Sequence, residues 1–270
     1  MRRHLYRALP AFWMLCASSS IPFVVQAADQ PGAVAPAQRE QIESVIRDYL
    51  ERNPEVVQKA LATLQQREAE AQQKHQREAI AEHSKDLYDD KSSPVAGNPK
   101  GTITLVEFFD YSCPHCKHSE PAVKSVLEQE GALGALRVIY KELPILGPGS
   151  LYAARAALAA DKQGKYPAFH RALMESDAID EPTVQALAKQ VGLDVPKLLK
   201  DMEAPEIAQA IDGNSRLAAA LDIQGTPAFI IGGQLLPGGV DGGVLAALIG
   251  IEKARAAAAA PAKTASSETR

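Results

Sequence analysis

The sequence predicts an α/β protein with an inserted helical block and a separate helical segment at its N-terminal end. The first observation is an apolar run, 103–109, followed by Cys113-Pro114-His115-Cys116, a helical pattern and a second apolar run, 136–140. This order of strand, helix and strand is typical of a parallel pair joined by a right-handed crossover. The second observation is repeated helix punctuation over 150–221, and the third is an apolar strand, 228–231, before a Gly-Gly turn.

Residues 1–27 are expected to be a signal peptide. Three arginines precede an apolar segment from Leu9 to Val25, and the pattern ends on the small residue Ala27. The segment is short and interrupted by prolines, so we expect export without membrane insertion. Cys16 lies within it, and the exported chain is therefore expected to keep only the two cysteines of the motif.

The charge balance limits the kinds of partner. The chain carries a formal net charge of -4, and removal of the basic signal segment makes the remainder more acidic. An acidic surface does not attract nucleic acid or an anionic membrane, so we expect neither as a partner.

Residues 38–64 form an N-terminal helical segment with a wide apolar stripe. The stripe includes Ile42, Ile46, Tyr49 and Leu64 at helical spacing, and Asn53-Pro54 divides the segment into two helices. Residues 65–86 are polar and are expected to be a solvated helix or a flexible stalk, which offers nothing for the stripe to pack on. We expect homo-oligomerisation through the stripe, the alternative being that these helices fold back on the remainder of their own chain.

The compact domain is expected to span 87–256. Its helical insertion is placed at about 149–221, with Asp180, Asp194 and Pro205 at helix starts. A last helix is expected from about 242 to 256, and the Ala-rich tail 257–270 is expected to be disordered.

The two cysteines of the motif are predicted to be redox-active. Placed at the start of a helix, Cys113 meets free backbone N–H groups that favour a thiolate, which can attack disulfides, whereas Cys116 lies one turn in and is more enclosed. A zinc site needs two further ligands at matched spacing, and haem attachment needs a histidine where Lys117 stands. A soft-metal protein that binds Cu(I) through Cys113, His115 and Cys116 remains as the alternative.

Three stretches resemble the thioredoxin fold of the DsbA-like thiol-disulfide oxidoreductases over residues 90–255. They are Glu107-Phe108-Phe109-Asp110-Tyr111-Ser112-Cys113-Pro114-His115-Cys116, Leu143-Pro144-Ile145-Leu146-Gly147-Pro148 and Gly225-Thr226-Pro227. The segment from about 41 to 64 is similar to the oligomerisation domain of the suppressor-of-copper-sensitivity C proteins, periplasmic members of that family that can be trimeric disulfide isomerases.

The resemblance implies a periplasmic enzyme that exchanges disulfides with unfolded or misoxidised proteins and is recycled by a membrane redox partner. It implies a trimer, no metal, and no cofactor beyond the Cys113–Cys116 disulfide. Pro114 and His115 would tune the thiolate, and a stabilised reduced form favours oxidation of substrates. The N-terminal oligomer favours isomerisation or reduction instead, so the direction stays open between oxidase and isomerase or reductase.

The resemblance also assigns roles to four residues outside the motif. Thr226-Pro227 matches a cis-proline loop that faces the dithiol, and the Thr226 backbone would pair with an extended substrate segment. Glu107 alternates onto the same side of its strand as Leu105, so it should be at least partly buried. By resemblance Glu107 accepts a proton from Cys116 and pairs with Lys141, the alternative being a strand-end glutamate that reaches solvent.

Overall fold

A computed structural model describes residues 35–131 and 133–259, and the expected signal peptide lies outside them. The chain divides into two compact units, 1–63 and 64–270, each of which is considered by itself. Within the described ranges no helix is both long enough and apolar enough to cross a membrane.

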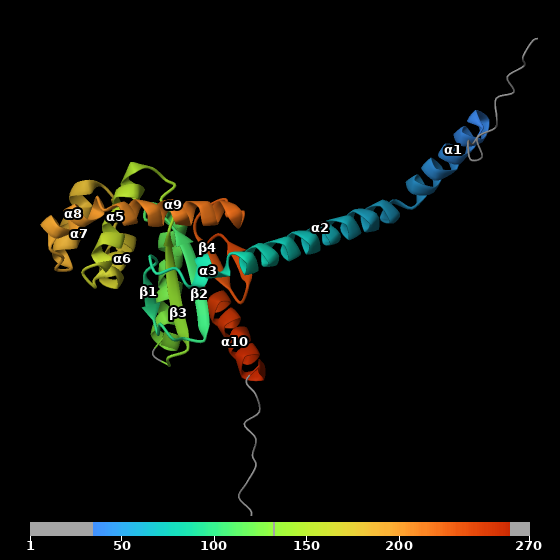
Figure 1. The fold of residues 1–270 in the computed structure, drawn as a ribbon. Helices are drawn as coiled ribbons and strands as arrows, with labels where there is room; N and C mark the ends of the chain where they lie inside the picture. The colour runs from blue at the N-terminus through green and yellow to red at the C-terminus, as the bar shows by residue number, and fades with distance from the viewer. Residues whose placement is uncertain (1–34, 132, 260–270) are drawn as a thin grey trace, which may run out of the picture. The chain divides into compact units, whose positions relative to one another are not determined.

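The second unit is built on a five-stranded sheet with the order β1-β3-β2-β4-β5. The central strand β2, Ile103–Phe109, pairs in parallel with β3, Leu136–Glu142, and antiparallel with β4, Ala228–Ile231. The edge strands β1, Val95–Gly97, and β5, Gln234–Pro237, are antiparallel to their neighbours (Figure 1). The parallel pair and the β4–β5 hairpin confirm the expectation, whereas the three-residue β1 was not predicted.

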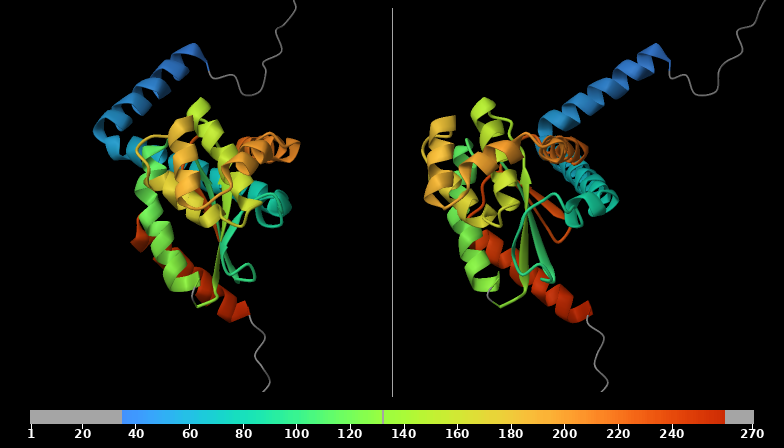
Figure 2. Two further views of the ribbon diagram at one scale, coloured as in Figure 1. Left: turned by 90° about the vertical axis from the view of Figure 1, so that its left-hand side faces the viewer. Right: turned by 60° about the vertical axis from the view of Figure 1, so that its left-hand side comes forward.

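Helices cover both faces of the sheet. Because side chains alternate along β2, Leu105 and Phe109 enter one core and Val106 and Phe108 enter another. The first core is closed by α4, Pro114–Val126, and α10, Gly242–Ala259, and the second by α3, Ser84–Tyr88, and α9, Pro205–Ala220 (Figure 2). A π-helical turn, Leu127–Gly131, follows α4. Helix α10 continues to Ala259, so the first three residues of the expected disordered tail are helical, and the rest of that tail lies outside the described residues.

The helical insertion lies between β3 and β4, as expected. It contains α5, Pro148–Asp161; α6, Tyr166–Glu175; α7, Glu181–Gln190; α8, Val195–Met202; and α9. Asp180 and Asp194 cap α7 and α8 by accepting hydrogen bonds from the backbone N–H groups of Thr183 and Lys197 at 2.9 and 3.0 Å. Phe169 and Leu173 of α6 join the first core, so the insertion and the sheet share buried side chains.

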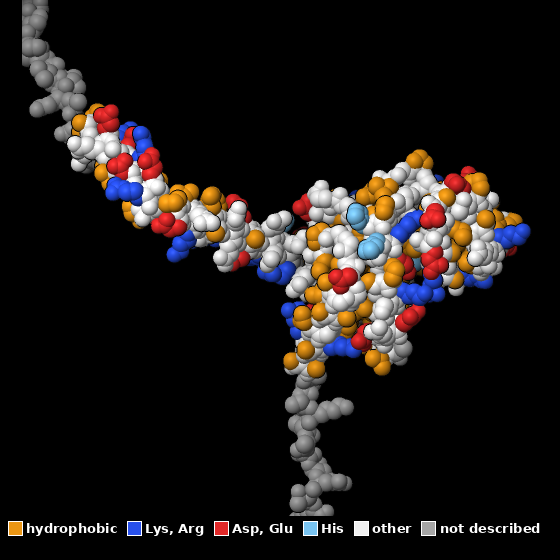
Figure 3. All heavy atoms as spheres, turned by 180° about the vertical axis from the view of Figure 1, so that it is seen from behind, with side chains coloured by type: hydrophobic (Ala, Val, Ile, Leu, Met, Phe, Trp, Pro, Cys, Tyr) orange, Lys and Arg blue, Asp and Glu red, His pale blue; other side chains and the backbone are white. Residues whose placement is uncertain are grey.

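The N-terminal segment is helical with a break at Asn53, as expected. α1 spans Pro36–Arg52 and α2 spans Pro54–Glu82, so the polar stretch continues the second helix. The predicted apolar stripe is exposed, with Val45 67% accessible, and Figure 3 shows its hydrophobic side chains between charged ones. One residue differs from the expected polar stalk: Ile80 is buried in the second core together with Leu87 of α3.

Candidate active site

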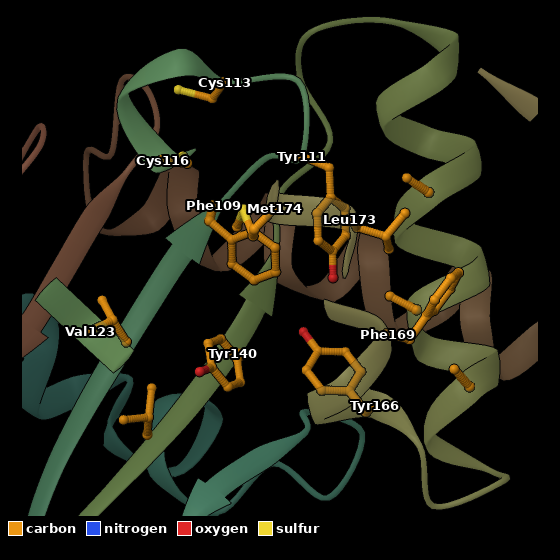
Figure 4. Close-up of a cluster of buried hydrophobic side chains, with 14 of the residues drawn as sticks. Phe109, Tyr111, Cys113, Cys116, Val123, Tyr140, Tyr166, Phe169, Leu173 and Met174 are labelled. Carbon is orange, nitrogen blue, oxygen red and sulfur yellow. The ribbon is translucent and has the colours of Figure 1, made fainter. Parts of the chain in front are cut away.

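The reactive turn joins the end of β2 to α4. Cys113 occupies the N-cap of α4 and Pro114 is the first helical residue, which suits a position that needs no backbone donor. The Cys113 N–H donates to the Asp110 carbonyl at 3.1 Å, and the Lys117 N–H donates to the Cys113 carbonyl at 3.1 Å. Figure 4 shows both cysteines beyond the end of the strand that carries Phe109. The predicted position of Cys113 at a helix start is therefore confirmed.

The sulfur atoms differ in their surroundings less than expected. Both cysteines are free thiols; Cys116 is fully buried, and Cys113 is only 4% accessible. Cys116 is the more enclosed of the two, as expected, but Cys113 is almost fully covered as well, because the Thr226 carbonyl lies against it and accepts a hydrogen bond from its sulfur at 3.1 Å. Burial raises the pKa of Cys116 well above its ordinary value, and the charges of Cys113 and Glu107 add to this.

The Thr226-Pro227 peptide bond is cis, as the resemblance implied. It immediately precedes β4, which lies beside β2, and this pairing brings the Thr226 carbonyl to the reactive turn. A backbone group from a distant part of the chain thus contacts the first cysteine directly. The geometry matches the expected loop that faces the dithiol.

Pro114 and His115 are both exposed on the first turn of α4. Within the described part of the chain, the His115 side chain makes no hydrogen bond or ion pair.

Glu107 is buried, but its predicted pairing with Lys141 is wrong. Neither carboxylate oxygen of Glu107 has a hydrogen-bond partner among the described residues. Burial raises its pKa well above the ordinary range, and the nearby Glu120 and Glu142 charges add to this. In register, Glu107 lies opposite Tyr140, and Lys141 lies opposite Phe108. Alternation therefore places Lys141 on the other face of the sheet, where its Nζ donates to Asp90 Oδ2 and to the Asp86 carbonyl, each at 2.7 Å.

A buried polar cluster between the sheet and α6 was not predicted. Glu142 Oε1 accepts hydrogen bonds from the hydroxyls of Tyr111 and Tyr166 at 3.1 and 2.9 Å. His170 Nδ1 lies 3.0 Å from the Tyr111 hydroxyl, and His170 Nε2 lies 3.5 Å from Glu120 Oε2. Burial raises the pKa of Glu142, which favours a protonated carboxyl. Figure 4 shows Tyr111 and Tyr166 with their hydroxyls turned toward each other.

Asp110 is a second residue that the sequence did not single out. Its carboxylate is almost fully buried and accepts hydrogen bonds from the backbone N–H groups of Ser112, Ile145 and Leu146 and from the Ser150 hydroxyl, at 2.7 to 2.9 Å. The signal that could have found Asp110 is a lone acid between an apolar strand and a cysteine motif, since such an acid needs several donors once buried.

No group of three or more His, Cys, Asp or Glu side chains is arranged to hold a metal ion within residues 35–131 and 133–259. The reactive groups that the described residues place near one another are the thiols of Cys113 and Cys116, the Glu107 carboxyl group and the Thr226 carbonyl.

A Cys-x-x-Cys turn at the start of a helix that follows the central strand, facing a cis-proline loop, defines the thioredoxin class of folds. The chain belongs to the family of DsbA-like thioredoxin domains, whose model matches residues 104–250. The model of the copper resistance protein ScsC N-terminal domain matches residues 38–71.

Solved structures are similar to both parts of the chain. A thioredoxin-like oxidoreductase from Silicibacter pomeroyi is 44% identical, with a TM-score of 0.60, over 65% of this chain and 98% of its own. A linker-deletion mutant of Proteus mirabilis ScsC is 30% identical, with a TM-score of 0.63, over 84% of this chain and 100% of its own. BcfH of Salmonella enterica Typhimurium is 29% identical, with a TM-score of 0.67, over 80% and 96%.

Curated relatives match between 52% and 60% of this chain. The chain spans 26% of the length of a Na(+)/H(+) antiporter NhaA from Herminiimonas arsenicoxydans, with 26% identity over 162 residues. The thiol:disulfide interchange protein DsbA of Bordetella pertussis is 27% identical over 157 residues, which are 55% of this chain and 72% of that protein.

Proposed function

We propose that this protein is a periplasmic thiol-disulfide oxidoreductase that exchanges disulfides with substrate proteins through Cys113 and Cys116. The observation that carries the proposal is the placement of Cys113 at the N-cap of α4, against the Thr226 carbonyl, with Cys116 one turn behind it. The free N–H groups of a helix start stabilise a thiolate, and a thiolate is the form that attacks disulfides.

In the reducing direction, the Cys113 thiolate attacks one sulfur of a substrate disulfide. A bond forms between Cys113 and that sulfur, and the other substrate sulfur leaves as a thiolate. Cys116 then loses its proton and attacks Cys113, which releases the reduced substrate and forms the Cys113–Cys116 disulfide. In the oxidising direction a substrate thiolate attacks Cys113 in that disulfide, and Cys116 leaves.

Cys116 needs a proton acceptor in the reducing direction because its raised pKa holds it as a thiol. Glu107 fills this role in our proposal: its charge acts on Cys116, it is buried beside the turn, and both its oxygens lack a partner among the described residues. The same carboxyl returns the proton when Cys116 leaves in the oxidising direction. Lys141, on the opposite face of the sheet, takes no part.

Trapping of the mixed disulfide tests the roles of the two cysteines. Cys116→Ser should accumulate a covalent adduct with a disulfide-bonded protein substrate, whereas Cys113→Ser should form none. Non-reducing electrophoresis with mass spectrometry of the adduct gives the readout. Adducts on Cys113→Ser, or their absence on Cys116→Ser, would reject the assignment of Cys113 as the nucleophile.

We also propose that the N-terminal helices join copies of the chain into a homo-oligomer, a trimer by resemblance. The support is the row of exposed apolar side chains, each at least 38% accessible, formed by Ile42, Val45, Ile46, Tyr49, Val56, Val57, Leu61 and Leu64. Apolar rows of this length normally mark an interface.

Mass measurement in solution tests the oligomer. Ile46→Glu with Leu61→Glu should reduce the mass to that of one chain, because charges in an apolar interface are costly to bury. Ser44→Glu with Gln58→Glu places the same charges at exposed polar positions of α1 and α2 and should leave the mass unchanged. A wild-type protein of single-chain mass would exclude this interface.

The substrates we propose are unfolded or misoxidised periplasmic proteins, and a membrane redox partner would restore the dithiol or the disulfide. Whether the protein oxidises or reduces its substrates follows from the redox state of the Cys113–Cys116 pair in the resting protein. A protein that is mostly oxidised in its compartment acts as an oxidase, and a mostly reduced one acts as an isomerase or reductase. Thiol alkylation in intact cells, followed by measurement of the mass shift, distinguishes the two.

A further inference from the structure

Ser119 is a fully buried polar residue of α4. Its neighbours one turn before and after it, Cys116 and Val123, belong to the first core. A buried hydroxyl needs a hydrogen-bond partner, and the chain after β5 provides one. The Val240 N–H donates to Ser119 Oγ at 3.1 Å, although the two residues are 121 positions apart in the sequence. Ser119 therefore ties the end of the β4–β5 hairpin to the helix that bears the reactive turn.

The short loop 238–240 connects Ser119 to the Thr226-Pro227 peptide. Its first residue, Gly238, donates its N–H to the Pro227 carbonyl at 2.9 Å, which continues the hydrogen bonding between β4 and β5. Its second residue, Gly239, lies close to α4, because a Cβ atom at this position would be 3.2 Å from Ser119 Oγ. The loop is therefore held at two places, by α4 and by the peptide that contacts the nucleophile.

These contacts form a closed circuit around the reactive turn. The Cys113 sulfur donates to the Thr226 carbonyl at 3.1 Å, and Ser119, six positions further along the chain, holds the other end of the loop. Six residues of helix rise about 9 Å, so the two contacts are well separated. A segment held at two separated points cannot turn about either of them. The position of the Thr226 carbonyl over the sulfur consequently depends on the Ser119 hydrogen bond.

We propose that Ser119 is a positioning residue for disulfide exchange: it holds the loop 238–240 against α4 and thereby keeps the Thr226 carbonyl over the Cys113 sulfur. With the Ser119 bond made, the loop is closed and the Thr226 backbone is in place to pair with an extended substrate. With the bond broken, the loop is displaced, the sulfur is accessible, and the edge that receives the substrate is no longer fixed. The inference rests on the proposed exchange reaction and names the residue that controls access to its nucleophile.

Two reactions of Cys113 report the two states of the loop. Both use the full-length chain with Cys116→Ser, and mass spectrometry follows the product on Cys113. Alkylation by iodoacetamide needs only an accessible sulfur and follows the displaced state. The second reaction uses a peptide whose cysteine carries thionitrobenzoate. The Cys113 thiolate attacks the peptide sulfur, a Cys113–peptide disulfide forms, and thionitrobenzoate leaves as a coloured thiolate. This reaction needs the fixed Thr226 backbone and follows the closed state.

Ser119→Ala removes the acceptor of one hydrogen bond and should favour the displaced loop about fivefold. The ratio of the alkylation rate constant to the peptide rate constant should rise by the same factor. This holds for any starting balance between the two states, because each rate constant is proportional to the population of one state.

Two control variants separate positioning from a general loss of stability. Ser125→Ala makes the same change on α4, where the hydroxyl accepts an exposed hydrogen bond from Gln129, and should leave the ratio unchanged. Asp194→Ala removes the cap of α8, which lowers the stability of the protein by a similar amount without touching the loop. It should leave the ratio unchanged as well.

Gly239→Ala tests the same contact from the side of the loop. Its methyl group would lie 3.2 Å from Ser119 Oγ, which is closer than Cβ contacts normally are, so the loop must shift and the ratio should rise. In the double variant Ser119→Ala with Gly239→Ala the hydroxyl is gone and the methyl group has room. The ratio of the double variant should therefore equal that of Ser119→Ala alone.

The outcomes separate the two proposals. A Cys116→Ser protein that forms no adduct with the activated peptide contradicts disulfide exchange itself. An unchanged ratio in Ser119→Ala, or an equal rise in Asp194→Ala, overturns the positioning role and leaves the exchange reaction intact. If Ser119→Ala does not fold, Gly239→Ala decides by the same ratio. Effects of the two substitutions that simply multiply in the double variant would show that Ser119 and the loop act independently.

Discussion

Replacement of Glu107 by glutamine should change how stability depends on pH. Glu107 is fully buried without a partner among the described residues, and its pKa in the folded protein lies well above 4.5, its ordinary value. The folded state therefore holds the proton more tightly than the unfolded state. Below pH 4.5 both states are protonated and the carboxyl costs nothing. As the pH rises above 4.5 the unfolded state releases its proton, so the free energy of unfolding falls until the folded pKa is reached.

The limiting slope is about 1.4 kcal/mol per pH unit for one group. Between pH 4.5 and pH 6.5 the wild type should therefore lose up to about 2.3 kcal/mol that the glutamine variant keeps, because the unfolded carboxyl is already half ionised at pH 4.5. Glutamine has nearly the same shape and is uncharged throughout, so the two proteins should be about equally stable at pH 4.5.

Urea unfolding of the reduced proteins at pH 4.5, 5.5 and 6.5 measures the difference. Glu203→Gln, at an exposed position after α8, serves as the control and should follow the wild-type curve. Parallel curves for wild type and Glu107→Gln would refute the argument that this carboxyl is held protonated by burial.

Three further substitutions test a buried ion pair, a buried hydrogen bond and a helix cap. Lys141→Ala should cost about 2–3 kcal/mol in urea unfolding at pH 7, because it leaves the partly buried Asp90 without its cation; an unchanged midpoint would contradict that pairing. Tyr166→Phe should cost about 1 kcal/mol by the same assay, through one lost hydrogen bond to a buried carboxyl. Asp194→Ala should cost about 1 kcal/mol in thermal unfolding by removing the cap of α8, while Asp212→Ala at an exposed site of α9 should cost almost nothing.

The features that the sequence predicted well are those that depend on neighbours along the chain. The caps at Asp180 and Asp194 use a donor three residues away. The β4–β5 turn has glycine φ angles of +57° and +73°, which is the conformation that a two-residue hairpin requires. The break at Asn53-Pro54 follows from the missing backbone donor of proline. Local chemistry fixes these elements, so a single sequence contains the information.

The partners of buried charges could not be predicted in the same way. Alternation along β2 placed Glu107 on the correct face, but the choice of Lys141 as its partner needed the register of β3, which shifts Lys141 beside Phe108. The carboxylate that Lys141 does pair with, Asp90, lies in an irregular loop before β1, where the sequence has no periodic pattern. The contact between His170 and the Tyr111 hydroxyl could not be predicted either, because the packing of α6 against the sheet brings the two residues together.

The Thr226 carbonyl above Cys113 also bears on how long the site survives in an oxidising compartment. Peroxide and similar small reagents convert accessible thiolates stepwise to sulfinic and sulfonic acids, which disulfide exchange cannot restore. The Cys113 sulfur is covered by backbone atoms, so little of its surface is accessible to such reagents before a substrate binds. The Thr226 peptide group that contacts Cys113 would therefore also protect its sulfur from irreversible oxidation.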